Sequence, residues 1–84
     1  MDESLVKLTE QLVLAVVNNK DAVGVKKFET DSDDLILIQV VVDKDDMSKL
    51  IGRNGKVVKA IRTLVQESSK FKENKLVKIN IDSI

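Results

Sequence analysis

The sequence contains no cysteine, no histidine and no proline. Without cysteine there are no disulfides or thiolate metal sites, and without histidine the commonest general base and the commonest metal ligand are missing. No apolar run approaches the roughly 20 residues that a membrane-spanning helix needs. The acidic residues Asp2 and Glu3 do not fit the basic start of a signal peptide. We therefore expect a cytoplasmic protein that does not enter a membrane.

Aromatic residues are almost as scarce, since Phe28 and Phe71 are the only two in the 84-residue chain. The apolar content of 43% is nonetheless ample for a core, which must then consist mainly of valine, leucine and isoleucine. No stretch rich in glycine and serine marks a linker, and a chain of this length forms one small domain. We therefore expect a single domain over residues 1–84.

The net charge is zero, but the charges are unevenly distributed. Residues 1–46 carry five lysines against eleven acids, a net charge of −6, whereas residues 47–72 carry seven basic residues against one acid, a net charge of +6. The local field of such a basic segment attracts a polyanion even when the whole chain is neutral. The alternative, equally open on charge alone, is that these cations only keep one face of a helix soluble.

Hydrophobic periodicity predicts six elements. They are a helix over 3–18, a strand over 23–30, a strand over 35–42, a short helix over 46–51, a longer helix over 56–69 and a strand over 76–82. The imperfect alternation of 23–30 fits an edge strand or a bulge. The almost wholly apolar 35–42 fits a strand that is central or covered on both faces. This order, α-β-β-α-α-β, favours an α+β fold with three helices on one face of a three-stranded mixed sheet.

The helix predicted over 56–69 carries two kinds of face. Its apolar residues recur at helical spacing, which predicts a buried stripe made of Val57, Ala60, Ile61, Leu64 and Val65. Its cations lie on the other side, at Lys56, Lys59 and Arg62. A basic loop is expected to follow, over residues 71–74.

The segment Gly52-Arg53-Asn54-Gly55 joins the two later helices. Gly52 can end the first helix in a conformation closed to most residues, and Gly55 lets the second helix begin with uncovered amides. We therefore expect unpaired amides over residues 52–56 that receive an anionic strand, because free amides at a helix start attract phosphate. Arg53 adds a fork of donors, and Asn54 tolerates positive φ.

The flanks of this loop extend the predicted site. Lys56 and Lys59 continue the positive track along the first turn of the helix, and Ile51 with Val57 or Val58 offers an apolar wall for bases. A bare G-x-x-G is common, and its simplest interpretation is a tight turn between helices. The nucleic-acid interpretation gains support because the loop joins a short helix to a long basic one after a buried strand.

The run from Leu50 to Ile61 reads Leu-Ile-Gly-Arg-Asn-Gly-Lys-Val-Val-Lys-Ala-Ile. It resembles the signature of the KH domain, I-G-x-x-G-x-x-I/V-x-x-I, a module that clamps about four nucleotides of backbone with its glycine loop. The element order is similar to the type II version of that fold, and the resemblance covers nearly the whole chain. With its opening helix and Ile-Arg-Thr-Leu-Val at 61–65, the chain resembles the small bacterial KhpA-type RNA-binding proteins. Val58 stands where isoleucine is common.

The resemblance implies single-stranded RNA as the ligand, with the glycine loop on the sugar-phosphate backbone and the flanking apolar residues along the bases. The predicted RNA-binding residues are Ile51, Gly52, Arg53, Asn54, Gly55, Lys56, Val58, Lys59 and Arg62. It also implies an RNA chaperone or post-transcriptional regulator that forms a homodimer, or a heterodimer with a larger KH-containing protein of the KhpB/Jag type. Ile61 is either a dimer contact or an ordinary core residue.

Other functions find less support. The acids at 31–34 and 43–46 do not form a calcium loop, because the sixth and twelfth positions counted from Asp31 are Ile36 and Val42 rather than glycine and glutamate. We expect no catalytic residues, no metal, no cofactor and no small-molecule substrate. Two alternatives stay open: a protein-interaction or dimerisation module on the KH scaffold, and a binder of single-stranded DNA.

Overall fold

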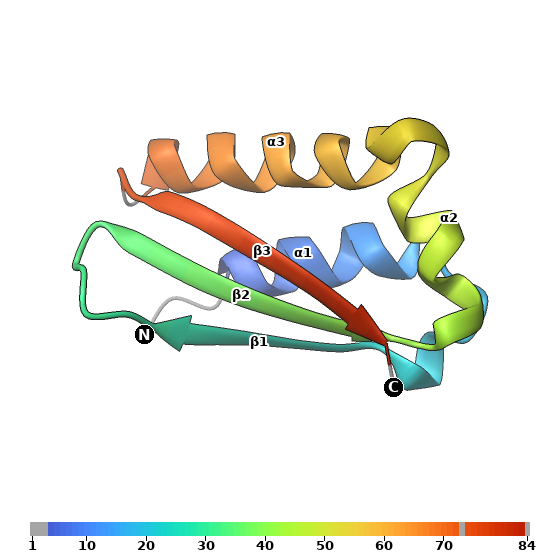
Figure 1. Cartoon of the computed structure of the whole chain (residues 1–84). Helices are drawn as coiled ribbons and strands as arrows, with labels where there is room; N and C mark the ends of the chain where they lie inside the picture. Colours follow the sequence, from blue (N-terminus) through green and yellow to red (C-terminus); the bar gives the residue numbers. More distant parts are fainter. Residues whose placement is uncertain (1–3, 73, 84) are drawn as a thin grey trace.

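The computed structural model describes residues 4–72 and 74–83 (Figure 1). Its helices and strands are α1 (Ser4–Leu14), β1 (Gly24–Glu29), β2 (Leu35–Val42), α2 (Met47–Ile51), α3 (Lys56–Lys72) and β3 (Leu76–Ser83). Single 3₁₀ turns, η1 (Lys20–Ala22), η2 (Lys44–Asp46) and η3 (Arg53–Gly55), separate some of them. The predicted order α-β-β-α-α-β is confirmed. In the described residues no helix is long and apolar enough to span a membrane.

The sheet has the strand order β1-β2-β3, with β1 antiparallel and β3 parallel to the central β2, so it is mixed as predicted. Every second side chain of β2 is buried, from Ile36 to Val42, while the alternate ones are partly exposed. This strand is therefore central but covered on one face, where α1 and α3 pack side by side (Figure 1). β1 lies at an edge, which agrees with its imperfect alternation.

The prediction for the buried stripe of α3 was partly wrong. Ile61 and Val65 are buried, but Ala60 and Leu64 are exposed. Among the side chains of α3 that the structure describes, Val58, Ile61, Val65 and Ser69 are buried. The helix is therefore rotated about its axis relative to the expected orientation, so that the flank bearing Ser69 faces the sheet.

Hydrogen bonds to the edge of β3 explain this rotation. Gln66 donates from Nε2 to the Lys75 carbonyl (3.0 Å) and accepts at Oε1 from the Val77 amide (2.8 Å). Ser69 Oγ donates to the same Lys75 carbonyl (2.9 Å). Arg62 Nη2 donates to the Ile79 carbonyl (3.2 Å). Three polar side chains of α3 thus satisfy backbone groups on the outer edge of β3, beside which no further strand lies in the described residues.

The first helix ends earlier than predicted, at Leu14 rather than residue 18. The amides of Asn18 and Asn19 instead donate to the two carboxylate oxygens of Asp46, at 3.1 and 2.9 Å. Asp46 is only 2% exposed and immediately precedes α2. Its carboxylate therefore fixes the chain after α1 to the start of α2. The predicted last turn of the helix, residues 15–18, does not form, because the chain there turns toward Asp46.

The third helix ends later than predicted. α3 continues to Lys72, so Phe71 is helical and not part of a loop, whereas residue 73 lies outside the described residues. Asn74 adopts a left-handed conformation (φ 54°), and its amide donates to the Ser69 carbonyl (2.8 Å). A left-handed residue closing the last turn is a common helix ending, and asparagine accepts it at little cost.

Candidate nucleic-acid interface

The loop between α2 and α3 depends on Gly52. Its amide donates to the Ser48 carbonyl (2.9 Å), which closes α2, and its backbone lies at φ 74°, ψ −179°. That region is essentially restricted to glycine. A side chain would also collide with the following helix, because a Cβ on Gly52 would lie 2.5 Å from Val57 Cγ2. The predicted special conformation of Gly52 is confirmed.

The tip of the loop consists of Arg53 and Asn54, both exposed. Asn54 is left-handed (φ 56°, ψ 28°), as its residue type allowed. Gly55 follows with φ 74°, and its environment is open, since the nearest side-chain atom to a Cβ there would be Val58 Cγ1 at 3.9 Å. Successive residues with positive φ turn the chain sharply and push the two tip side chains outward.

The expectation of unpaired amides throughout residues 52–56 was wrong in part. The Gly52 amide closes α2, Gly55 donates to the Gly52 carbonyl (3.3 Å), and Lys56 donates to the Arg53 carbonyl. Within the described residues, the amides of Arg53 and Asn54 are the two of this stretch without a partner. The loop therefore offers two backbone donors at its tip and not a continuous row.

Exposed cations surround this tip. They are Arg53, Lys56, Lys59 and Arg62. Lys59 folds back along the loop, since its Cε lies 4.0 Å from the position of a Cβ on Gly55. In residues 4–72 and 74–83 no carboxylate pairs with any of the four. The loop and the first turns of α3 therefore carry positive charge that can attract an anionic ligand.

Apolar residues flank the loop on both sides, but only one of them is on the surface. Ile51, at the end of α2, is 40% exposed and offers a side chain to a ligand. Val58, on the first turn of α3, is 8% exposed and packs under the loop. Of the two residues predicted to line a base groove, Ile51 presents the apolar surface and Val58 supports it from below.

A shallow hollow continues the site away from the loop. It encloses about 320 Å³ between α3 and β3 and is lined by Arg62, Val77, Lys78, Ile79 and Asn80. Arg62 lies roughly 10 Å along the helix from Gly55, given a rise of about 1.5 Å per residue. The sequence predicted Arg62 but missed the β3 residues, although their strand had been located. No local signal in β3 shows that its outer edge faces α3.

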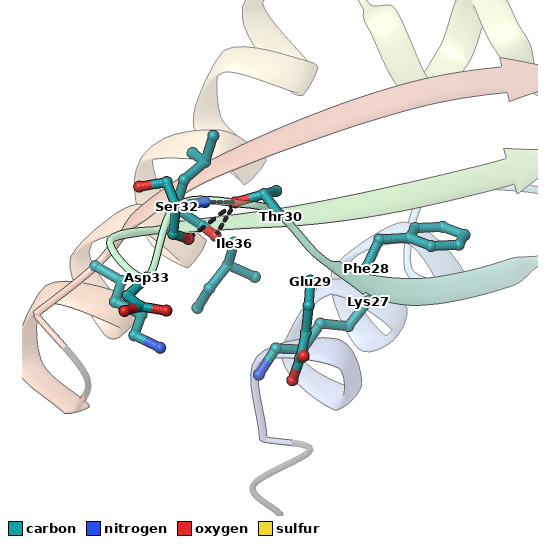
Figure 2. Close-up of a pocket in the computed structure, with 9 residues that line it drawn as sticks. Lys27, Phe28, Glu29, Thr30, Ser32, Asp33 and Ile36 are labelled. Carbon is teal, nitrogen blue, oxygen red and sulfur yellow. Dashed lines mark hydrogen bonds between the residues drawn. The ribbon is translucent and has the colours of Figure 1, made fainter.

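A second hollow surrounds the turn between β1 and β2, at the end of the molecule opposite the loop between α2 and α3 (Figures 1 and 2). It encloses about 130 Å³. Thr30 spans this turn, donating from Oγ1 to the Ser32 carbonyl (2.9 Å) and accepting from the Ser32 amide (3.1 Å). Charges of both signs line it, including Lys27, Glu29 and Asp33, so it offers no uniform surface to an anion.

Two carboxylates of the acidic cluster at residues 43–46 have structural partners. Asp43 accepts at Oδ1 from the Asp45 amide and at Oδ2 from Asn19 Nδ2, both at 2.9 Å. The Asp45 amide, and next the Asn19 side chain, hold the pKa of Asp43 below its ordinary value. Asp46 accepts the two amides described above. Both carboxylates act as acceptors that order the approach to α2.

Comparison with known proteins places these features in a family. The family model described as KhpA/KhpB, KH domain, matches residues 6–81. The chain is 39% identical to RNA-binding protein KhpA of Caldanaerobacter subterraneus, over 89% of this chain and 96% of that protein. It is 35% identical to RNA-binding protein KhpA of Oceanobacillus iheyensis (88% and 95%) and to that of Clostridium perfringens (89% and 96%).

Solved structures with a similar fold include two of Era. One is a crystal structure of Era in complex with MgGDPNP and nucleotides 1506-1542 of 16S ribosomal RNA, with a TM-score of 0.69 and 15% identity. The other is a variant of Aquifex aeolicus Era bound to GDP.AlF4-, with a TM-score of 0.70 and 14% identity. The chain is covered to 99% and 96%, but it spans 31% of each Era chain, so the likeness concerns the fold alone.

Proposed function

The chain belongs to the KhpA/KhpB KH-domain family, and from that premise we propose that it binds single-stranded RNA through the Gly52–Gly55 loop and the basic start of α3. The observation that carries this proposal is the exposed tip of Arg53 and Asn54, whose amides have no partner among the described residues, beside cations that no described carboxylate neutralises. The names of the relatives, RNA-binding protein KhpA, support it. Residues 1–84 then form one type II KH domain that acts in the cytoplasm by binding and not by catalysis.

In this proposal the loop receives the sugar-phosphate backbone. Arg53 presents its fork of donors to a phosphate, since guanidinium and phosphate match in geometry. The free amides of Arg53 and Asn54 donate to the same or a neighbouring phosphate. Gly52 and Gly55 act through shape: they carry no side chain, so the strand approaches the backbone closely. Lys56 and Lys59 extend the contact to the next phosphates.

The bases then lie over the hollow between α3 and β3. Ile51 covers the first base, and Val58 keeps the loop in position from beneath. Arg62 lies at the border of the hollow, with one of its nitrogens bound to the Ile79 carbonyl and its remaining donors free to meet a base or a phosphate. A site of this size holds about four nucleotides, the usual footprint of a KH loop.

Pairing with a second KH protein belongs to the same proposal. Ala60, Leu64 and Phe71 lie along one exposed flank of α3, where an apolar surface is otherwise unexplained. Ile61 is buried in the core, which supports its interpretation as an ordinary core residue. The exposed flank fits a second copy of the chain or a larger KH-containing partner of the KhpB/Jag type. Two linked grooves would raise the apparent affinity through effective concentration, which suits an RNA chaperone or post-transcriptional regulator.

The same flank supports a second candidate function, a module whose main role is assembly with other proteins. In that case the loop would matter little for activity. An experiment on the loop separates the two candidates, because assembly through α3 does not require Arg53 or Asn54.

The decisive variant is Arg53→Asp with Asn54→Asp. It places two carboxylates where the phosphate is proposed to bind, and both positions are exposed, so the fold should survive. Binding to a random-sequence single-stranded RNA pool is measured by fluorescence anisotropy over a series of salt concentrations. We expect wild-type affinity in the micromolar range, roughly −8 kcal/mol, and loss of binding in the variant. The wild-type slope of log K against log salt should be about −0.7 for each phosphate contacted.

The matched control is Lys7→Asp with Gln11→Asp. Both residues are exposed on α1, and the net charge changes by the same amount as in the loop variant. Retained binding in the control with loss in the loop variant supports a localised site. Unchanged affinity in the loop variant refutes the proposal, and equal loss in both variants shows a general charge effect. Single-stranded DNA and duplex RNA, titrated in parallel, test the preference for single-stranded RNA.

A further inference from the structure

The tip of the loop between α2 and α3 contains the single asparagine of the chain that is followed by glycine, in the pair Asn54-Gly55. An asparagine side chain loses ammonia when the next backbone nitrogen attacks its carbonyl carbon. A side chain on the next residue obstructs this attack, so glycine is the neighbour that permits it best. The other four asparagines precede asparagine, lysine, lysine and isoleucine. The sequence therefore separates Asn54 from every other asparagine of the protein.

The Asn54 side chain is free to react. It is exposed, and no hydrogen bond holds it among the residues that the structure describes. Asn19 differs, because its Nδ2 donates to Asp43 Oδ2 (2.9 Å). Asn74 is also exposed and has the same left-handed conformation (φ 54° against 56°), but Lys75 follows it. Asn54 thus combines an unheld side chain with a glycine neighbour.

The attacking nitrogen of Gly55 is loosely held. Its amide donates to the Gly52 carbonyl at 3.3 Å, which is longer than a typical amide hydrogen bond. Ring closure also needs rotation of the Asn54 backbone away from the observed ψ of 28°. The following glycine accepts that rotation, since it tolerates many backbone angles, and no described atom lies closer than 3.9 Å to its Cβ position. The reactive conformation is therefore a local opening of this turn.

Positive charge around the loop favours the same reaction. The attacking nitrogen becomes negative as it loses its proton, and negative charge then develops on the side-chain carbonyl oxygen. Gly55 immediately precedes the 17-residue α3, whose first turn carries partial positive charge. The exposed side chains of Arg53, Lys56 and Lys59 add full charges. Charges placed where the opposite charge develops lower the barrier to a reaction.

We propose that Asn54 is a site of spontaneous deamidation, which turns a loop that attracts anions into one that repels them. The Gly55 nitrogen forms a bond to Asn54 Cγ, the Cγ–Nδ2 bond breaks, and ammonia leaves with the amide proton, giving a cyclic imide. Water then opens either of the two bonds that join the ring nitrogen to a carbonyl carbon. One opening gives aspartate, and the other gives isoaspartate, in which the chain continues through the former side chain.

Either product carries a carboxylate at the tip of the loop, beside the cations proposed to bind phosphate. That carboxylate competes with the phosphate for these cations and repels it, so the effect on binding rests on the proposed RNA binding. The fold should persist, because a carboxylate just before α3 is favourable at a helix N-terminus. Deamidation therefore changes binding without unfolding the domain.

The test follows deamidation at each asparagine of the full chain. The protein is incubated at mildly alkaline pH and physiological temperature, digested with a protease that cleaves after glutamate, and mapped by mass spectrometry. Asn54 is the one asparagine in fragment 30–67, whereas the others fall in fragments 11–29 and 74–84. We expect the change from amide to acid, together with isoaspartate, in fragment 30–67 well before the other two. Asn54→Gln should abolish it, because glutamine would have to close a larger ring. Equal rates in the three fragments, or a change that persists in Asn54→Gln, overturn the proposal.

Lys75→Gly gives the matched control. It creates the same dipeptide at Asn74, which is also exposed and left-handed but follows the C-terminal end of α3, where the helix dipole is negative. The hydrogen bonds of Lys75 to Gln66 and Ser69 use its backbone carbonyl, so the substitution leaves them in place. We expect Asn74 in this variant to lose ammonia more slowly than Asn54. Equal rates would overturn the part assigned to the positive start of α3.

The effect on binding is measured separately. The deamidated protein is separated from the intact protein by anion exchange, and both, together with Asn54→Asp, are titrated with the single-stranded RNA pool. We expect the modified protein and the variant to bind at least about tenfold more weakly, since a like charge close to phosphate opposes binding. Unchanged urea midpoints should show that the fold is intact. Deamidation at Asn54 with unchanged RNA affinity overturns the effect on binding. If instead the intact chain binds no RNA, the proposed function fails while the site of deamidation stands.

Discussion

The glycines of this chain provide a graded test of how the loop is held, because each has a different environment. Gly52 combines φ 74° and ψ −179° with a Cβ position 2.5 Å from Val57 Cγ2 and 2.9 Å from Val57 Cβ. Gly55 shares the positive φ but has no atom closer than 3.9 Å to its Cβ position. Gly24, at the start of β1, has neither constraint. Substitution by alanine should therefore cost most at Gly52 and nothing at Gly24.

The expected magnitudes follow from these geometries. Gly52→Ala adds a backbone strain of about 1–3 kcal/mol to an overlap with Val57 that costs about 1–3 kcal/mol, so the free energy of unfolding should fall by about 2–6 kcal/mol. Gly55→Ala adds a left-handed residue, which costs about 1–2 kcal/mol. Gly24→Ala should be neutral or stabilising by about 0.5 kcal/mol. A domain of 84 residues has about 4–13 kcal/mol in total.

Urea unfolding followed by circular dichroism measures all three variants against the wild type. The slope of free energy against urea should stay constant, so that the midpoints report stability directly. Equal losses for Gly52→Ala and Gly55→Ala would show that the collision with Val57 relaxes at no cost. A stable Gly52→Ala variant would refute the described loop geometry altogether.

Two further predictions concern the carboxylates before α2. Asp46→Ala should lower the free energy of unfolding by about 1–3 kcal/mol, since it leaves the amides of Asn18 and Asn19 without their acceptor; the exposed Asp45→Ala is the control, and an equal loss in both variants would contradict the role of Asp46. Asp43 has a lowered pKa in the folded state, so its charged form stabilises the fold above the ordinary value of 3.8 and loses that effect as pH falls through the lowered pKa. The stability difference between wild type and Asp43→Asn in urea should therefore shrink in that acidic range, and a difference independent of pH would rule out this linkage.

The order of elements and the position of the loop could be predicted because their signals are local. The run of residues 35–42 identifies a central strand by composition alone, and the observed bounds of β2 are the same. Gly52 and Gly55 bracket the loop, and their positive φ values follow from residue type. These features need no information from distant parts of the chain.

The predictions fail where contacts between residues far apart in the sequence determine where a helix ends or which side of it is buried. α1 ends early because the carboxylate of Asp46, far along the chain, takes the amides of Asn18 and Asn19. α3 is rotated because Gln66 and Ser69 bind the edge of β3, and both flanks of the helix carry apolar residues that fit a core equally well. Periodicity gives the spacing of a stripe, but it does not identify which flank the tertiary contacts select.

The hydrogen bonds of the loop amides could not be predicted from the sequence either, although they join residues close in the chain. The sequence indicates an exposed glycine turn but does not show that Gly55 and Lys56 form their own turn bonds. The role of the backbone in the proposed site is therefore narrower than expected, and Arg53 with its neighbouring cations takes a larger share. This makes the charge-reversal variant a stronger test than any change to the glycines.

The bonds from Gln66, Ser69 and Arg62 to the border of β3 have a consequence for colloidal behaviour. The unpaired backbone groups of an edge strand can bind a strand of another chain and so start a fibre. Here side chains of α3 already bind several of these groups at the border of β3. On the opposite border, consecutive lysines at 26 and 27 in β1 repel an incoming strand. Side-chain hydrogen bonds thus protect one border of this small sheet, and lysine charges protect the other. We expect both features to disfavour fibril formation at high protein concentration.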